Sequence, residues 1–159
     1  MNKPSLTIKL IISIIACVAL GSIGGIATAS SIDTWYVTLN KPSFNPPNWI
    51  FAPVWTTLFT LMGIAAALVW HEGINNKTVK NALILFGIQF LLNMLWSWLF
   101  FGMQNPQLAF IEIILLWLFI LFTIRAFFGI KNISGWLLVP YILWVSFASV
   151  LTFCIWQLN

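Results

Sequence analysis

The sequence predicts an all-α integral membrane protein, a bundle of five transmembrane helices with a proline-rich loop between the first two helices that acts as a lid. Its 159 residues are 61% hydrophobic and only 6% charged, whereas soluble domains carry about 25% charged residues. Five apolar stretches are each close to the length of about 20 residues that a helix needs to cross the hydrocarbon core. The chain has no internal repeat, so residues 1–159 are predicted to form a single domain.

The first apolar stretch predicts a helix over Leu6–Ala29. Lysines precede it and Ala27-Thr28-Ala29 resembles a cleavage site, so a signal peptide is the alternative interpretation. The length of the apolar run matches a membrane span and favours an uncleaved helix. Gly21 and Gly25 stand at GxxxG spacing, which suits either packing within the bundle or a dimer face.

The loop at residues 30–48 is rich in aromatic residues and prolines. Pro42, Pro46 and Pro47 each fix the backbone angle φ and remove a hydrogen-bond donor. A long loop stiffened in this way, which leads directly into an apolar helix, is suited to covering the mouth of a bundle. We therefore interpret the loop as a lid.

Four further helices are predicted by apolar length. They are Trp49–Trp70, Ala82–Met103, Leu108–Phe128 and Trp136–Gln157. The connections between them, at 71–80, 104–107 and 129–135, are short, so neighbouring helices are expected to pack antiparallel.

The basic residues predict the orientation in the membrane. If five helices alternate, one side of the membrane receives Lys3, Lys9, Lys77, Lys80, Arg125 and Lys131, and the other receives Lys41 alone. The positive-inside rule then places the N-terminus in the cytoplasm and the C-terminus outside. We expect a multi-pass protein of a bacterial-type cell membrane whose proline-rich loop faces outward.

Several function classes lack the residues that they need. The scattered basic residues make no nucleic-acid footprint, and Cys17 and Cys154 lie in separate apolar runs without metal-ligand partners. His71 ends a helix far from the loop, which argues against a haem ligand. No set for nucleophilic or acid–base catalysis is recognisable. Glu112, about one turn inside a helix, is either functional, snorkelling or neutral, and Arg125 is expected to contact lipid headgroups.

Three of the predicted helices each carry an aromatic stripe at helical spacing. The stripes are Phe51, Trp55, Phe59 and Met62; Gln89, Asn93, Trp96 and Phe100; and Leu137, Tyr141, Trp144 and Ala148. Such stripes are common in plain helix cores, where amides bond across helices. The alternative is a pocket for a large, flat, apolar ligand, with rings on its faces and hydrogen bonds from Asn93 and Tyr141 at its rim.

The chain resembles the translocator protein family, also known as tryptophan-rich sensory proteins or peripheral benzodiazepine receptors (TspO/MBR). The resemblance rests on a WYxxLxKPxxxPP segment, a following PVWTxL segment and a later PYxxW segment. These begin at Trp35, Pro53 and Pro140, and Gln89, Asn93, Trp96-Ser97 and Phe100-Phe101 also match.

The resemblance implies a five-helix bundle, often dimeric, whose cavity is capped by the first loop and binds porphyrins such as protoporphyrin IX or benzodiazepine-type drugs. The ligand would be a porphyrin or another flat apolar molecule, with membrane lipid as surroundings, no metal and no required cofactor. Carried over to this chain, Trp35 and Pro47 belong to the lid with Pro42. The expected pocket residues are Trp55, Asn93, Trp96, Tyr141, Trp144 and Ala148, joined by Phe51 and Phe59 from the stripe on their helix.

The resemblance leaves three functions open. The first is a receptor for porphyrin-type ligands used in sensing or transport. The second is a light-dependent porphyrin-degrading enzyme that uses Trp55 and Trp144. The third is a lipid- or sterol-binding scaffold. The chain departs from the family pattern at Phe44 in the loop, and it has Phe153 and Gln157 where the mammalian cholesterol motif needs a tyrosine and a basic residue, which disfavours tight sterol recognition.

Overall fold

The structure, a computed structural model, describes residues 4–159 and every side chain among them except that of Ala27. Lys3, one of the basic residues in the charge count, lies outside the described residues. In the described part, five helical segments are long and apolar enough to cross a membrane. They are Leu6–Ile32, Asn48–His71, Lys77–Gly102, Pro106–Phe128 and Asn132–Leu158. The predicted all-helical class with five membrane-spanning segments is confirmed.

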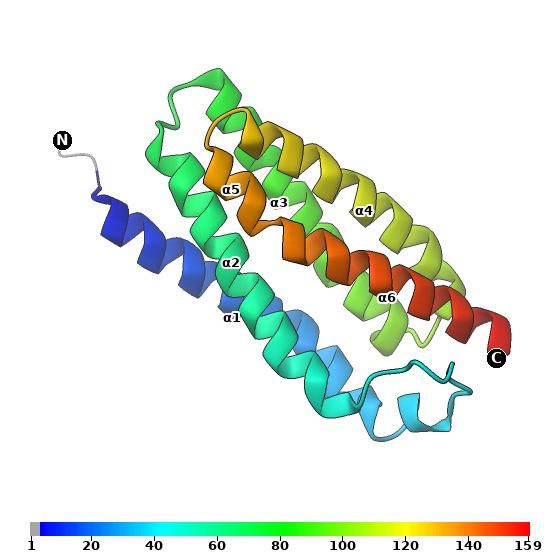
Figure 1. The fold of residues 1–159 in the computed structure, drawn as a ribbon. Coiled ribbons are helices and arrows are strands. Elements are labelled where there is room, and N and C mark those ends of the chain that lie inside the picture. Colours follow the sequence, from blue (N-terminus) through cyan, green and yellow to red (C-terminus); the bar gives the residue numbers. More distant parts are fainter. Residues whose placement is uncertain (1–3) are drawn as a thin grey trace.

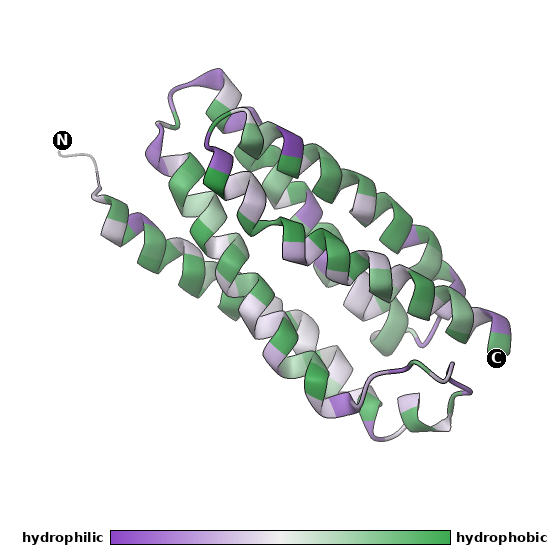
Figure 2. Ribbon diagram, in the orientation of Figure 1, coloured by the Kyte–Doolittle hydropathy of each residue, from purple (hydrophilic) through white to green (hydrophobic). Residues whose placement is uncertain are grey.

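The helices form one bundle, in which the start of α1 and the end of α6 lie at opposite ends (Figure 1). Helix α1 packs along α2, α3 along α4, and α4 along α6. Figure 2 shows apolar residues over most of the helix lengths and hydrophilic residues gathered in the connections at the two ends. That distribution fits a bilayer, because charged side chains in the hydrocarbon are costly. The helices are α1 (Leu6–Ile32), α2 (Phe51–His71), α3 (Lys77–Ser97), α4 (Pro106–Phe128), α5 (Asn132–Leu137) and α6 (Val139–Leu158).

Small residues bring α1 and α2 into close contact. A Cβ atom added at Gly63 would lie 2.6 Å from Ile14 Cα, so the two backbones nearly touch there. Gly21 of α1 lies against the ring of Phe59 on α2. Nothing lies within 4 Å of a Cβ added at Gly25. Of the two glycines at GxxxG spacing, Gly21 therefore serves packing within the bundle.

Lysines tie helices together at the end of the bundle where α2 finishes. The buried Lys9 donates a hydrogen bond of 3.3 Å from Nζ to the carbonyl oxygen of Trp70 and lies over the Trp70 ring. A cation at the C-terminus of a helix satisfies unpaired carbonyls and complements the helix dipole. Lys131 pairs with Glu72 at 2.8 Å and holds the pKa of that carboxyl below its ordinary value, but the pair is exposed and adds little stability.

Helix α3 begins five residues earlier than the predicted Ala82. The Asn76 side chain accepts a hydrogen bond of 2.9 Å from the Thr78 backbone N–H, which caps the helix at Lys77. The prediction followed the apolar run and assigned this polar first turn to a loop, which was wrong.

The C-terminal end of α3 continues into a π-helical segment, Trp98–Gly102. Ser31 Oγ of α1 donates a hydrogen bond of 2.8 Å to the carbonyl oxygen of Phe101 in this segment. The side chain of Ser31 is buried at this contact. Ser31 still belongs to α1, which ends at Ile32 and not at the predicted Ala29. The π-helical segment presents Phe100 and Phe101 to the interior.

The last predicted helix, Trp136–Gln157, is wrong in detail because it is interrupted. Helix α5 ends at Leu137 and α6 starts at Val139, with Leu138 between them. Pro140 has no N–H to donate to the carbonyl four residues back, which breaks the ladder at this point. Residues 132–135, predicted as a turn, belong to α5.

Candidate functional site

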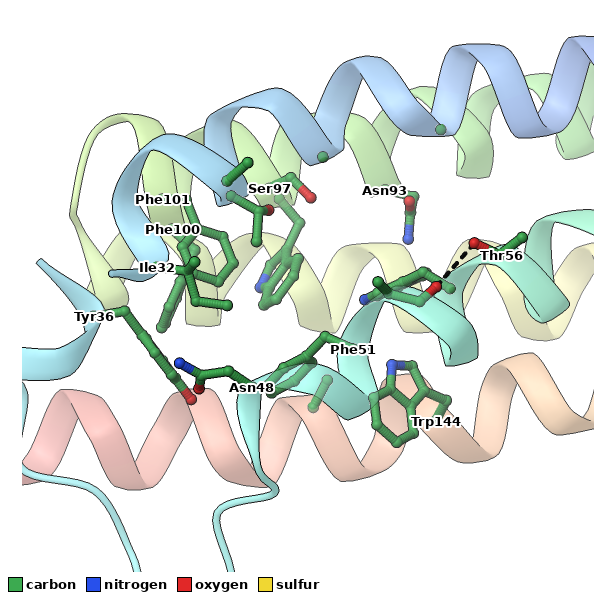
Figure 3. Close-up of a pocket in the computed structure, with 18 of the residues that line it drawn as sticks. Ile32, Tyr36, Asn48, Phe51, Thr56, Asn93, Ser97, Phe100, Phe101 and Trp144 are labelled. Carbon is green, nitrogen blue, oxygen red and sulfur yellow. Dashed lines mark hydrogen bonds between the residues drawn. The ribbon is translucent and has the colours of Figure 1, made fainter. Parts of the chain in front are cut away.

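A cavity of about 410 Å³ lies inside the bundle between α1, α2, α3 and α6 (Figure 3). Its size falls within the range of about 300–1,000 Å³ that is typical of small-molecule sites. Aromatic and small side chains make up most of its wall, and eight of the lining residues carry an amide or a hydroxyl group. The aromatic members are Tyr36, Phe51, Trp55, Phe59, Trp96, Phe100, Phe101, Trp144 and Phe147.

The structure brings most of the predicted pocket residues together. Phe51, Trp55 and Phe59 of α2, Asn93 and Trp96 of α3, and Trp144 and Ala148 of α6 all line the cavity. Tyr141 does not line it. The Tyr141 side chain is buried beside the cavity, and its ring packs edge-on against Trp55 with 6.4 Å between the ring centroids.

The aromatic walls are held by ring-to-ring contacts. Trp55 stacks on Phe59 and Trp96 on Phe100, each with centroids 5.5 Å apart. Phe51 of α2 meets Trp144 of α6 edge-on at 6.2 Å. These geometries are the preferred ones for aromatic pairs, so the apolar walls of the cavity are stabilised by contacts between their own rings.

Two buried hydrogen-bond donors on cavity-lining residues have no partner within the described part of the chain. They are Nδ2 of Asn93 and Nε1 of Trp96. Figure 3 shows Asn93 reaching from α3 toward the space that Thr56 and Trp144 border. Buried donors of this kind normally find a partner, so this part of the wall is suited to specific polar recognition.

The prediction missed the wall that α1 supplies. Val18, Gly21, Ser22, Gly25, Thr28, Ala29 and Ile32 all line the cavity. The signal was a run of small residues at helical spacing. Small residues leave room next to a helix, but they form no aromatic stripe from which a cavity wall could be predicted.

The first loop contributes different residues from those predicted for the lid. Tyr36 and Asn48 line the cavity, whereas Trp35, Pro42 and Pro47 do not. Tyr36 is only 2% exposed, and its hydroxyl donates a hydrogen bond of 2.6 Å to Asn45 Oδ1. Burial raises the pKa of Tyr36 to about 12, so the hydroxyl keeps its proton at neutral pH.

The loop is fastened to the bundle at two places. Trp35 packs edge-on against Phe100 with centroids 5.5 Å apart. The Asn40 backbone N–H donates to Asn159 Oδ1 at 2.9 Å, and Asn159 Nδ2 donates to the Asn40 carbonyl oxygen at 3.0 Å. The loop is thus connected to the end of α6 and to the π-helical segment that follows α3, as well as to α1 and α2 along the chain.

The remaining candidates do not meet at the cavity. Glu112 of α4 is buried but does not line it, and His71 lies at the far end of α2. Within residues 4–159, no three His, Cys, Asp or Glu side chains form a group that would hold a metal ion. The arrangement offers aromatic stacking and a few hydrogen bonds rather than acid–base chemistry.

A family model for the TspO/MBR family matches residues 13–157 of the chain. The chain belongs to this family. It is 48% identical over 159 residues to the tryptophan-rich protein TspO of Chlorobaculum tepidum, covering 100% of this chain and 99% of that protein. It is 44% identical over 153 residues to the Archaeoglobus fulgidus protein of the same name, covering 96% and 97%. The human translocator protein is 36% identical over 127 residues, covering 79% of this chain and 75% of that protein.

The TspO/MBR match includes every residue that lines the cavity. The lining residues run from Val18 to Ile155, inside the matched range of 13–157. The resemblance seen in the sequence is confirmed, and the chain is a multi-pass integral membrane protein of this family.

Proposed function

We propose that the chain is a membrane receptor that binds porphyrins, such as protoporphyrin IX-like tetrapyrroles, and benzodiazepine-type ligands in the cavity, for tetrapyrrole sensing, transport or regulation. The observation that carries the proposal is an aromatic cavity of about 410 Å³ bounded by four helices of a TspO/MBR bundle. Flat aromatic faces suit a macrocycle, and the Asn93 amide together with the unpartnered Nε1 of Trp96 suits its polar edge.

The proposal includes the orientation, the lid and the oligomer. The first loop would close the cavity from outside, with the N-terminus in the cytoplasm of a bacterial-type cell and the C-terminus outside. Tyr36 and Asn48, which line the cavity, support the lid. A homodimer is expected to use α1, whose side chains such as Ile15 and Ile26 are largely exposed in the single chain.

Porphyrin binding is tested by titrating the purified protein in detergent with protoporphyrin IX and following the quenching of tryptophan fluorescence. Asn93→Ala and Trp144→Ala are each expected to weaken binding by about tenfold, because each removes a cavity contact of about 1.4 kcal/mol. Trp136→Ala is the matched control, since this exposed tryptophan of α5 does not line the cavity. Unchanged affinity in both cavity variants would refute the site assignment.

Light-dependent porphyrin degradation is a second candidate, favoured by the position of Trp55 and Trp144 in the wall of one cavity. An indole beside a photo-excited macrocycle is a suitable electron donor. Under illumination, the bound porphyrin should lose its absorbance more slowly in Trp55→Phe and Trp144→Phe than in the unchanged protein. Trp98→Phe, which alters an exposed tryptophan outside the cavity, is the control. Equal rates in all four proteins would exclude these two residues as the agents.

A lipid- or sterol-binding scaffold is the third candidate function. Native mass spectrometry after exposure to protoporphyrin IX distinguishes it, because a scaffold would retain only bulk lipid in the cavity.

A further inference from the structure

Four buried polar side chains lie on α3, α4 and α6 at or near the cavity, and most of their polar atoms have no hydrogen-bond partner within the described residues. Gln89, Asn93, Glu112 and Tyr141 are 1%, 3%, 7% and 1% exposed. The unpartnered atoms in this part of the chain are both amide atoms of Gln89, Nδ2 of Asn93, both carboxyl oxygens of Glu112 and the Tyr141 hydroxyl. Since buried polar groups are costly when unpaired, this cluster calls for an explanation.

The members of the cluster come from α3, α4 and α6. Gln89 and Asn93 are one turn apart on α3, Glu112 is on α4, and Tyr141 is on α6. Helix α4 packs along both α3 and α6. The Asn93 amide and the Glu112 carboxyl both lie close enough to the Tyr141 hydroxyl to influence it, although Asn93 Nδ2, the Glu112 oxygens and the Tyr141 hydroxyl have no hydrogen-bond partner within the described residues. Tyr141 is therefore the group that can connect Asn93 to Glu112.

One order of hydrogen bonds along this connection would satisfy all three groups. Asn93 Nδ2 is a donor only, so it would donate to the Tyr141 hydroxyl oxygen. The Tyr141 hydroxyl would then donate its own proton to a Glu112 oxygen. Asn93 is the one member of the four that also lines the cavity. If Tyr141 holds the Asn93 nitrogen on the side away from the cavity, the Asn93 amide oxygen stays available to a bound molecule.

The charge state of Glu112 follows from its surroundings. The salt bridge within residues 4–159 joins Lys131 to Glu72, so no cation pairs with Glu112 there. An isolated carboxylate inside the hydrocarbon is far more costly than the neutral acid. The un-ionised acid can still accept a bond from Tyr141 through its carbonyl oxygen, and its O–H is free to donate to an acceptor such as Oε1 of Gln89.

We propose that Tyr141 and an un-ionised Glu112 are positioning residues for Asn93, which they hold from behind so that its amide oxygen faces the ligand in the cavity. The proposal depends on the proposed function only for the identity of the ligand. The arrangement of the three side chains can be tested in the protein without any ligand.

Infrared spectroscopy of the ligand-free protein tests the arrangement. The sequence has only three carboxyl side chains, Asp33, Glu72 and Glu112, and Glu112 alone among them is buried. We expect a carbonyl band of an un-ionised carboxyl at neutral pH that disappears in Glu112→Gln and shifts in Tyr141→Phe and Asn93→Ala. Absence of the band, or a band that neither Tyr141→Phe nor Asn93→Ala shifts, would overturn the proposal.

A double-mutant cycle tests the effect on the ligand, with protoporphyrin IX as the probe. Glu112→Leu and Tyr141→Phe should each weaken binding by about fivefold to tenfold, the range for one hydrogen bond inside a membrane protein. Neither should weaken it further in an Asn93→Ala background. Glu112→Gln should retain the affinity, because its amide oxygen still accepts from Tyr141 and its shape preserves the fold.

Ser146→Ala is the matched control for both measurements. It removes the 2.8 Å hydrogen bond from Trp117 Nε1 to Ser146 Oγ, which joins the same two helices, α4 and α6. It should change neither the band nor the affinity. Equal losses of affinity in the presence and absence of Asn93 would show that Glu112 and Tyr141 act on packing and would overturn the positioning role. If porphyrin fails to bind at all while the band behaves as expected, the proposed function fails and the arrangement behind Asn93 stands.

Discussion

Gly25→Trp is expected to abolish porphyrin binding, with a loss of affinity of about a hundredfold or more, while the bundle remains folded. Gly25 lines the cavity, and a Cβ added there meets nothing within 4 Å. A side chain can therefore grow from α1 without displacing the backbone, and an indole would take up a large part of the space of about 410 Å³. A hundredfold loss corresponds to about 2.7 kcal/mol, the scale expected when a ligand loses its contacts with a whole wall.

The measurement is an absorbance titration of protoporphyrin IX, which is unaffected by the added tryptophan. Ile26→Trp is the control, because it adds the same indole to the next residue of α1 at a side chain that is 68% exposed. Thermal melting of both variants in detergent checks that the fold is intact. A Gly25→Trp protein that melts normally and binds the porphyrin with full affinity would mean that the ligand occupies a different place.

The sequence predicted the helices well because apolar length is nearly sufficient to define a membrane span. Its errors fall where polar or local chemistry decides the boundary. The Asn76 cap starts α3 within a lysine-rich turn, and Ser31 bonds the carbonyl of Phe101 near the end of α1. Neither effect is visible in the apolar pattern. Pro140 was visible in the sequence, but its consequence at Leu138 is a matter of backbone hydrogen bonding.

The cavity residues could be predicted in part, because helical periodicity is also a regular pattern of the sequence. Periodicity identifies the face of a helix on which a residue lies, and it correctly grouped Trp55, Asn93 and Trp144 on faces that meet. It gives no information on depth within the bundle. Tyr141 shares a stripe with Trp144 yet lies beside the cavity, and small residues such as Gly25 give no stripe at all.

Gly63→Leu is expected to have the largest effect on stability of any substitution considered. A Cβ at Gly63 would lie 2.6 Å from Ile14 Cα and 2.9 Å from Ile14 N and from the Ser13 carbonyl oxygen, all of them backbone atoms of α1. Backbone atoms cannot rotate away, so α1 must separate from α2. Overpacking costs about 1–3 kcal/mol for added methylenes, and a whole leucine between two backbones should cost at least about 3 kcal/mol.

Gly87→Leu is the matched control on α3, because a Cβ added at Gly87 meets nothing within 4 Å. Leucine favours the helix over glycine by up to about 1 kcal/mol, so this variant should melt at the same temperature or higher.

The loss of stability expected from Gly63→Leu also affects the site, because α1 supplies one wall of the cavity and lies against α2. Separation of the two helices should therefore weaken porphyrin binding together with the fold. A Gly63→Leu protein as stable as the unchanged chain would show that α1 is free to move away from α2 at little cost, which would make α1 a movable wall of the cavity.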